Sequence, residues 1–263
     1  MNSTVESTCR TVVVAGHGMV GHRFAEALRS RDTDGRWRIV IVGEETLPAY
    51  DRVGLSAYVD GWDADALALP GNVFQGDALV ELRTGERVER IDRSARTVTT
   101  SIGAVIAYDT LVLATGSYPF VPPVPGHELP QCFVYRTIED LDRIRAAALA
   151  GGPGARGVVI GGGLLGLEAA NTLRLLGLEA HVVEYNDRLM HTQVDTGGGA
   201  VLEKLVTDLG LRVHTGVGTS AIESAEDGVG VRVSLSDESV IDASLVVFSA
   251  GVRPRDQLAR EAG

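Results

Sequence analysis

Cysteine is scarce in this 263-residue sequence. The chain holds only Cys9 and Cys132, which lie far apart and belong to no CxxC motif or Cys/His cluster. Iron-sulfur and zinc sites are built from closely spaced thiolates and imidazoles, so neither can be assembled, and a disulfide framework is excluded as well. We expect no metal site and a reducing, intracellular compartment.

Basic residues are outnumbered, with 24 Lys and Arg against 35 Asp and Glu and a net charge of −11. Nucleic-acid binding needs clustered Lys and Arg, and no basic run occurs, so we expect no nucleic-acid partner. Long apolar runs are missing too, since no stretch of ~18 uninterrupted apolar residues is present. The first apolar run, residues 11–14, leads into a glycine turn instead of a signal-peptide cleavage site. We therefore expect a soluble cytoplasmic protein that does not enter a membrane.

Glycine is in excess, with 32 residues, while aromatic residues make up only 5% of the chain. Because there is no collagen-like period and only 9 prolines occur, the glycines must lie in particular turns. The length suits one or two domains of ~100–200 residues each.

Two segments repeat one pattern of strand, glycine turn, helix and strand. The first runs through RTVVVAG, a helical stretch over 20–29 and WRIVIVG, and the second through RGVVIGG, a helical stretch over 165–176 and EAHVVEY. Short β-branched runs separated by helical periodicity predict β-α-β units. Only two copies occur, which favours two nucleotide-binding modules over a solenoid.

The remaining segments complete the expected organisation. Residues 77–109 show alternating strands with turn signals, which predicts a small antiparallel sheet. The buried strand YDTLVLATGS follows, and then YPFVPPVPG, whose four prolines predict an irregular connector at a domain boundary. The segment DASLVVFSAGVRP predicts a last strand of the same buried kind. The expected fold class is α/β, with two Rossmann-like dinucleotide-binding domains of the three-layer type with a small antiparallel sheet.

The first glycine turn has the GxGxxG spacing. In this motif the first glycine permits the tight turn, the second lets the backbone approach a pyrophosphate, and the third lets helix and strand pack closely, with the anion on the helix N-terminus. A carboxylate at the end of the second strand then hydrogen-bonds a ribose hydroxyl. The candidate cofactor-binding residues of this copy, including its helix start and strand-end acids, are Gly16, Gly18, Met19, Val20, Gly21, Glu44 and Glu45.

The second glycine turn repeats this spacing, and its second strand ends in Glu184. A carboxylate there accepts from a ribose 2′-hydroxyl and repels a 2′-phosphate, which favours NADH over NADPH. Arg188 could soften that preference, but we favour a solvated loop charge. The candidate residues of this copy are Gly161, Gly163, Leu164, Leu165, Gly166 and Glu184.

Glu168 falls in the first turn of the second predicted helix. It is explained equally well by favourable interaction with the helix dipole and by a place beside a nicotinamide ring. His17 and His22 have no Ser, Cys or Asp arrangement for nucleophilic chemistry and are taken as incidental, and the other histidines lack metal-ligand spacing.

The two glycine turns, separated by an ATG turn at Ala114, Thr115 and Gly116, resemble the FAD- and NAD(P)-dependent pyridine nucleotide-disulfide oxidoreductase superfamily. The strings GHGMVGHRF, PAYDRVGLS, ATGSYPFVPPVPG and HVVEYNDRLMHTQVDTGGG most resemble the N-terminal flavin module of the NAD(P)H-dependent nitrite reductase large subunit. The resemblance implies an NAD(P)-binding domain at 118–246 inserted into an FAD-binding domain at 1–117 and 247–263, with the C-terminal part of the FAD domain missing. It also implies FAD and NAD(H) as cofactors.

The resemblance further implies a role for each candidate residue. The first glycine turn and Glu44 would hold the FAD adenosine and pyrophosphate, and the second turn and Glu184 would hold NAD. Arg52 would approach the FAD pyrophosphate, its alternative being an ion pair with a neighbour. Backbone groups at Val88 would face the adenine, the ATG turn would close over the flavin, and Glu168, the catalytic candidate, would lie near the nicotinamide.

Three departures from the superfamily pattern narrow the expected chemistry. Disulfide- and peroxide-reducing relatives carry a redox Cys near the flavin, but YDRVGLSAYVDG has none. Ferredoxin-reductase-like relatives often carry Lys where this chain has Ala57. The chain also ends before the Gly-Asp turn that binds the FAD ribityl chain and before the iron-sulfur and sirohaem regions, so we expect that it does not reduce nitrite by itself.

The leading hypothesis is an FAD-dependent NADH oxidoreductase module. It would pass hydride from NADH to flavin and then electrons to an iron-sulfur domain or protein. The alternatives are a non-catalytic dinucleotide-binding fragment without a complete flavin site, and a rubredoxin- or ferredoxin-type reductase. The sequence leaves the oligomeric state open.

Overall fold

The computed structural model describes residues 9–59, 61, 63–69, 74, 76–152, 154–225 and 228–263. The chain forms two compact units. The first unit extends to Arg52 and includes Ala64–Ser117 and Pro254–Gly263, and the second includes Val53–Asp63 and Tyr118–Arg253. Among the described residues, no helix is both long enough and apolar enough to cross a membrane.

A parallel four-stranded sheet forms the centre of the first unit. Its order is β3 (Val80–Thr84), β2 (Trp37–Gly43), β1 (Arg10–Ala15) and β7 (Thr110–Leu113). Strands buried on both faces favour continuous β-branched runs, which explains the sequences of β1 and β2.

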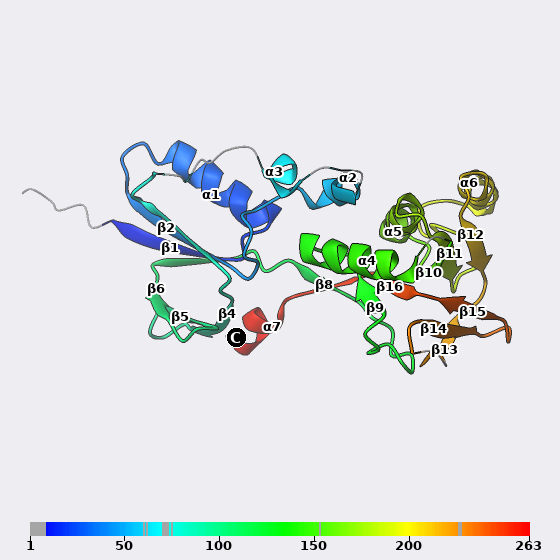
Figure 1. The fold of residues 1–263 in the computed structure, drawn as a ribbon. Coiled ribbons are helices and arrows are strands. Elements are labelled where there is room, and N and C mark those ends of the chain that lie inside the picture. The colour runs from blue at the N-terminus through cyan, green and yellow to red at the C-terminus, as the bar shows by residue number, and fades with distance from the viewer. Residues whose placement is uncertain are drawn as a thin grey trace, which may run out of the picture. The chain divides into compact units, whose positions relative to one another are not determined.

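The two faces of this sheet are covered by different layers. Val12 and Val14 pack with Ala25 of α1 (Met19–Arg31), whereas Val13 packs with Val98 on the opposite face. That face is covered by the antiparallel sheet of β4 (Val88–Asp92), β5 (Thr97–Thr100) and β6 (Val105–Ala107), and α7 (Gln257–Glu261) packs on β4. Figure 1 shows α1 and this small sheet on opposite sides of β1 and β2. The expected antiparallel sheet within 77–109 is therefore present, except that β3 joins the parallel sheet.

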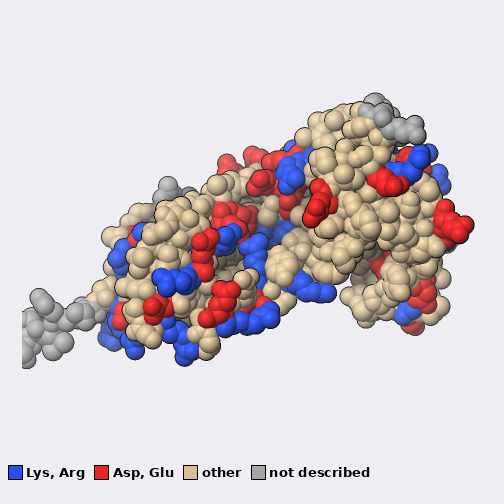
Figure 2. All heavy atoms as spheres, turned by 90° about the horizontal axis from the view of Figure 1, so that it is seen from below, with Lys and Arg blue, Asp and Glu red and all other residues tan. Residues whose placement is uncertain are grey.

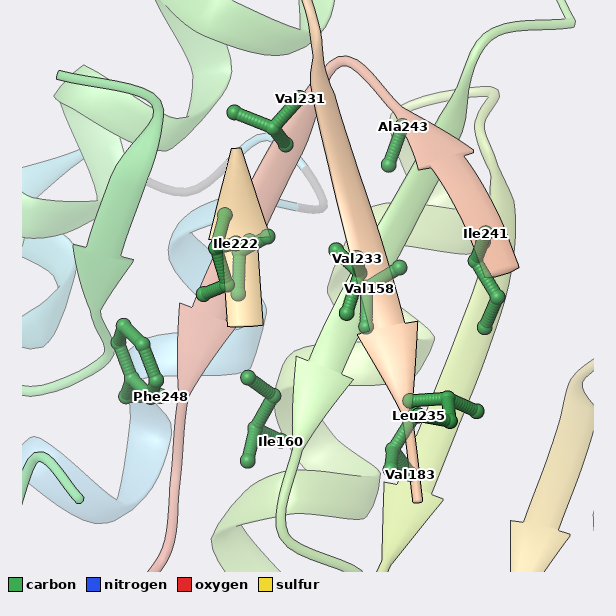
Figure 3. Close-up of a cluster of buried hydrophobic side chains, with 11 residues drawn as sticks. Val158, Ile160, Val183, Ile222, Val231, Val233, Leu235, Ile241, Ala243 and Phe248 are labelled. Carbon is green, nitrogen blue, oxygen red and sulfur yellow. The ribbon is translucent and has the colours of Figure 1, made fainter. Parts of the chain in front are cut away.

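The second unit has the same three layers around a five-stranded parallel sheet. Its order is β12 (Arg212–Thr215), β11 (Glu179–Glu184), β10 (Arg156–Ile160), β16 (Leu245–Phe248) and β9 (Cys132–Val134). The antiparallel sheet of β13 (Thr219–Ser224), β14 (Val231–Leu235) and β15 (Val240–Ala243) covers one face. Figure 3 shows the core between these sheets, where Val158, Val183 and Phe248 face Ile222 and Val233.

Helices cover the other face of this sheet. They are α4 (Ile138–Gly151) and α5 (Leu164–Leu175), with α6 (Thr196–Asp208) beside β12. The segment before α3 (Ala64–Leu67) forms a 3₁₀ turn, η1 (Arg52–Gly54), and a short helix, α2 (Leu55–Val59). In the second unit α2 packs on α4 and α5, and the Tyr58 hydroxyl donates to Asp142 over 2.8 Å.

The chain passes between the two units at Ser117 and again at Pro254, and the short strands at these places, β8 (Ser117–Pro119) and β17 (Val252–Pro254), pair with each other. The connector expected to be irregular from residue 118 thus begins with a short strand, because Pro is tolerated at the end of an edge strand.

The compact units differ from the expected domain boundaries in two places. The sequence interpretation assigned residues from 247 onward to the first domain, but β16 pairs with β10 and β9 of the second unit. Residues 53–63, expected in the first domain, also group with the second unit. A fully buried run such as LVVF fits either parallel sheet equally well, so its composition does not reveal which sheet it joins.

Candidate dinucleotide-binding sites

The first glycine turn joins β1 to α1 in a conformation that requires two of its glycines. Gly16 has a φ of +117°, and a Cβ there would lie 2.1 Å from the carbonyl oxygen of Ala114. A Cβ at Gly21 would lie 2.0 Å from the carbonyl oxygen of Gly16. Both distances are far below van der Waals contact, so these two glycines allow strand, turn and helix to pack together.

The middle glycine of this turn has a different environment. Gly18 is the N-cap residue of α1 with ordinary extended backbone angles, φ −91° and ψ −170°, and no atom lies within 4 Å of a Cβ built on it. No side chain caps the helix at this end. The first amide groups of a helix carry partial positive charge and need acceptors, so an uncapped start beside open space suits a phosphate group.

The second turn, between β10 and α5, repeats this geometry. Gly161 has a φ of +118°, and its Cβ would lie 2.4 Å from the Ser249 carbonyl oxygen. A Cβ at Gly166 would lie 1.8 Å from the carbonyl oxygen of Gly161, whereas no atom lies within 4 Å of a Cβ at Gly163, the uncapped N-cap residue of α5. Space for a phosphate is therefore present in each unit.

In the described part of the chain, the other two long helices, α4 and α6, have side-chain caps. Thr137 and Asp140 form a reciprocal capping box on α4, and the Asp195 side chain accepts from the Gly198 amide on α6. Both uncapped long helices follow a glycine turn.

Apolar side chains begin both uncapped helices. Val20 on α1 is 73% exposed, and Leu164 and Leu165 on α5 are 59% and 38% exposed, while Met19 is half-buried. Exposed apolar groups beside open amides can contact the uncharged parts of a nucleotide.

Glu184 is held tightly at the end of β11. Its side chain is 6% exposed, and one carboxylate oxygen accepts from the Gly162 amide over 2.6 Å. The other oxygen accepts from the backbone and side-chain nitrogens of Asn186 over 2.8 and 2.6 Å. Neutral donors thus orient this carboxylate toward the turn, and a carboxylate has further lone pairs for a ribose hydroxyl. Gly162 and Asn186 were not among the sequence-derived candidates, because neither belongs to the glycine spacing.

Arg188 is not the solvated loop charge that the sequence suggested. Its guanidinium donates to the carbonyl oxygens of Val194 and His191 over 3.1 Å each and to Asp187 over 2.7 Å. A Cβ at Gly199 would lie 2.9 Å from the Arg188 Cβ, so the side chain packs closely against α6. Arg188 therefore stabilises the loop that follows β11.

The strand-end acids of the first unit are ion-paired. Glu44 accepts from Arg87 over 2.9 Å and from Arg255, and these guanidiniums hold the pKa of its carboxyl below the usual value although burial opposes that effect. Glu45 pairs with Arg52, whose guanidinium lies over the Tyr50 ring. In Figure 2, basic and acidic side chains are interspersed over the first unit in this way.

The ATG turn is tied to the C-terminal segment. The Thr115 hydroxyl donates to the Arg255 carbonyl oxygen over 2.7 Å, and the Arg255 amide donates to the Gly116 carbonyl oxygen over 2.9 Å. Gly116 has a φ of +69°, which favours glycine. Arg255 thus joins the ATG turn to Glu44. The two residues are 211 positions apart in the sequence, so no local sequence pattern predicts this contact.

Two remaining candidates lie on regular elements. Val88 begins β4, is 7% exposed and pairs with Thr100, so its side chain belongs to the core and only its backbone could face a ligand. Glu168 is the fifth residue of α5, which begins at Leu164, so the expectation that it lies in the first turn was wrong by one residue. Because burial raises its pKa, the dipole explanation is weakened.

Each unit therefore gathers its own candidates at the carboxyl edge of its parallel sheet. This is the edge where open α/β sheets bind ligands. The fold defines a protein built from two dinucleotide-binding modules, each with a glycine turn at the start of a helix.

Comparisons with known proteins agree with this class. A family model described as pyridine nucleotide-disulphide oxidoreductase matches residues 10–263. The chain is 51% identical over 252 residues to the nitrite reductase [NAD(P)H] large subunit of Klebsiella oxytoca, covering 96% of this chain and 26% of that protein. It is 33% identical over 253 residues to the ferredoxin–NAD(+) reductase subunit of the benzene 1,2-dioxygenase system of Pseudomonas putida, covering 96% of this chain and 60% of the relative.

A solved structure shows the same fold. The covalent putidaredoxin reductase–putidaredoxin complex matches with a TM-score of 0.88 and 30% identity, over 97% of this chain and 62% of that one. The chain belongs to the pyridine nucleotide-disulphide oxidoreductase family, a family of NAD(P)H oxidoreductases that use flavin and pyridine nucleotide, which confirms the resemblance derived from the motifs. It spans about a quarter of the nitrite reductase subunit and less than two thirds of the other two proteins.

Proposed function

We propose that this chain is an FAD-dependent NADH oxidoreductase module that passes electrons to an iron-sulfur acceptor. The observation that carries the proposal is the duplicated glycine turn, uncapped at its helix and open at its middle glycine, once in each unit. When bound, the flavin accepts hydride from NADH and can release electrons one at a time.

FAD is assigned to the first turn. Gly18 leaves room for the pyrophosphate against the start of α1, and Glu44 and Arg52 lie at the same edge of the sheet. The tie between Thr115, Gly116 and Arg255 would hold the ATG turn in place beside the flavin.

NADH is assigned to the second turn. Gly163 leaves the matching room at α5, and Glu184 offers the ribose a carboxylate that only neutral groups hold. A 2′-phosphate would meet that negative charge, while the nearby Arg188 is engaged with its own loop. We therefore propose that NADH is preferred to NADPH.

Glu168 is proposed to contact the nicotinamide end. It lies one helical turn along α5 from the glycine turn, and burial raises its pKa. Burial raises the pKa of Tyr135, the negative charge of Glu168 adds to that effect, and the Tyr135 hydroxyl lies 3.2 Å from the Thr172 hydroxyl oxygen. Glu168 is therefore close enough to the buried Tyr135–Thr172 pair to act on it electrostatically.

The test is the absorption spectrum of the purified chain with added FAD, before and after NADH under anaerobic conditions. We expect flavin bands that NADH bleaches faster than NADPH does. Binding of both dinucleotides without bleaching would identify a non-catalytic binding module instead, and absence of flavin binding would refute the assignment of the first turn. Glu168→Gln should slow bleaching while Glu223→Gln, an exposed change on β13, should not.

A second candidate acceptor is favoured by the relatives. The benzene dioxygenase subunit is named a ferredoxin–NAD(+) reductase, and the solved complex joins a reductase to putidaredoxin. A small separate electron carrier is thus the alternative to an iron-sulfur domain of a longer chain. Reduction of a purified ferredoxin at a rate well above that of an artificial dye would favour the separate carrier.

A further inference from the structure

The strand registers align the two glycine turns residue by residue. Ala15 pairs with Val42 in the first unit, and Ile160 pairs with Val183 in the second. In each copy the amide of the following glycine donates to that valine carbonyl over 2.8 Å. The positions on either side can therefore be compared directly.

In this alignment one position in the turn faces one position at the end of the second strand. The first copy has a side chain at the turn position and glycine at the strand end, and the second copy has the reverse. The turn residue His17 corresponds to Gly162, and the strand-end residue Gly43 corresponds to Glu184. A Cβ at Gly43 would lie 2.7 Å from the His17 Cβ, and a Cβ at Gly162 would lie 2.9 Å from the Glu184 Cβ. In each copy the space at one glycine, the gap between turn and strand end, is thus filled from the facing position, by His17 at Gly43 and by Glu184 at Gly162, where Leu189 Cδ2 also lies 2.7 Å from the built Cβ.

The backbone does not require glycine at either empty position. Neither Gly43 nor Gly162 has a positive φ, whereas Gly16 and Gly161 do. Glycine is needed at Gly43 because the His17 side chain occupies the space. The choice of side chain in the gap is therefore separate from the conformation of the turn.

We propose that His17 is a binding residue of the first turn and hydrogen-bonds the adenosine ribose there, as Glu184 is proposed to do in the second turn. The inference rests on the proposed function, because it takes FAD as the ligand of the first turn. Glu44, one residue beyond the gap, corresponds to Tyr185, which is 81% exposed. Glu44 is thus an additional contact and not the counterpart of Glu184.

The surroundings of His17 suit this role. Its Nε2 lies 3.5 Å from Nδ1 of His22, and its Nδ1 is buried and has no hydrogen-bond partner among the described residues. Burial, assisted by His22, lowers the pKa of His17 to about 4, against the opposing charge of Glu45, so the ring is neutral at pH 7. A neutral imidazole offers one donor and one acceptor, and because Nδ1 is buried, the ribose hydroxyl would pair with Nε2 in place of the long contact to His22.

The neighbouring position supports the same comparison. Glu45 corresponds to Asn186, which donates to Glu184 in the second copy. In the first copy the charge of Glu45 acts on His17, while its carboxylate accepts from Tyr50 over 2.6 Å. In both copies, the residue three places past the paired valine influences the side chain in the gap.

The test compares His17→Leu, His17→Asn and the exchange variant His17→Gly/Gly43→Glu with the single change Gly43→Glu. FAD affinity is measured by flavin fluorescence on the full apoprotein, NADH affinity serves as the control for the second turn, and thermal unfolding reports the fold. We expect His17→Leu to weaken FAD binding about tenfold, the loss of one hydrogen bond, with NADH affinity and unfolding unchanged. His17→Asn should stay within about threefold of the parent.

The exchange variant leaves one side chain in the gap, but Glu45 stands where Asn186 donates to Glu184 in the second copy, so the introduced carboxylate lacks those donors and the variant should bind FAD more weakly than the parent. Gly43→Glu alone forces two side chains into one gap and should be less stable than the exchange variant. Equal FAD affinity for His17→Leu and the parent would overturn the inference while leaving the proposed function intact. A parent chain that binds no FAD would instead remove the proposed function, and the inference with it.

Discussion

Gly18→Ala and Gly163→Ala form a matched pair that separates the two proposed nucleotide sites. Both glycines are N-cap residues with extended backbone, φ −91° at Gly18 and −79° at Gly163, and neither has an atom within 4 Å of the built Cβ. Alanine is therefore accommodated without strain in the free protein. Replacing a glycine in an allowed conformation stabilises by ~0.4–1 kcal/mol through the unfolded chain, while alanine is a poorer N-cap residue than glycine by a similar amount, so each variant should stay within about 1 kcal/mol of the parent.

The cost should appear only when a dinucleotide binds. The added methyl occupies the space beside the uncapped helix start where a phosphate would approach. Losing one charge-assisted hydrogen bond to a phosphate costs ~1.5–3 kcal/mol, which corresponds to about 10- to 150-fold in Kd. Gly18→Ala should weaken FAD binding by that factor and leave NADH binding unchanged, and Gly163→Ala should do the reverse.

The assay is titration of each apoprotein variant with FAD and NADH separately, with thermal unfolding of the same samples. Each variant is the control for the other, because the two changes are chemically identical and lie in equivalent turns. Parent-like affinity for both ligands in both variants would refute the assignment of phosphate sites to these turns. An exchange of the two effects would show that FAD and NADH had been assigned to the wrong turns.

Three further predictions rest on other contacts. Gly21→Ala places a methyl 2.0 Å from a backbone oxygen and should lower the free energy of unfolding by ~2–4 kcal/mol in urea denaturation, in contrast to Gly18→Ala; a loss below ~1 kcal/mol would contradict the packing. Glu184→Gln removes the charge but keeps an acceptor, so the NADPH-to-NADH ratio of kcat/KM should rise about tenfold, and an unchanged ratio would count against the carboxylate as the determinant. Burial lowers the pKa of His17 from 6.5 to about 4, so the unfolded chain takes up a proton at a pH where the folded chain does not, and the free energy of unfolding should fall by ~1–2 kcal/mol as the pH falls from 6.5 to 4. His17→Asn should lose that share of the pH dependence in urea denaturation at pH 7 and 4.5, and a pH dependence identical to that of the parent would contradict a buried neutral His17.

Local sequence patterns predicted the parts of the fold that depend on local chemistry. The glycine spacing predicted both turns, because positive φ and close packing at Gly16 and Gly161 allow no other residue. The β-branched runs predicted the buried strands for a similar reason, since burial on both faces leaves few alternatives.

Local sequence patterns could not predict contacts between segments that are distant in the sequence. The run that forms β16 has the composition of any buried parallel strand, and only its pairing with β10 and β9 places it in the second unit. Arg255 reaches Glu44 across 211 residues, and a single arginine carries no signal of its partner.

The exchange at His17 and Gly43 was missed for a related reason. His17 looked incidental because no nucleophilic or metal-binding pattern includes it, and its close approach to Gly43 at the end of β2 is visible only in the folded chain. The start of α5 one residue earlier than expected likewise moved Glu168 out of the first turn. Helix ends are commonly misplaced by this amount.

If the uncapped starts of α1 and α5 bind dinucleotides as proposed, the stability of this protein depends on its cofactor supply. A ligand that binds only the folded state adds RT ln(1 + [L]/Kd), ~2.7 kcal/mol when its concentration is 100 times Kd. Thr137 and Asp195 cap α4 and α6 from within the chain, whereas the first amides of α1 and α5 have no side-chain cap and would gain the phosphate groups of the proposed ligands in place of water. A cell that runs short of either dinucleotide would therefore hold a less stable population of this chain, more open to proteolysis, before any loss of catalysis was measured per folded molecule.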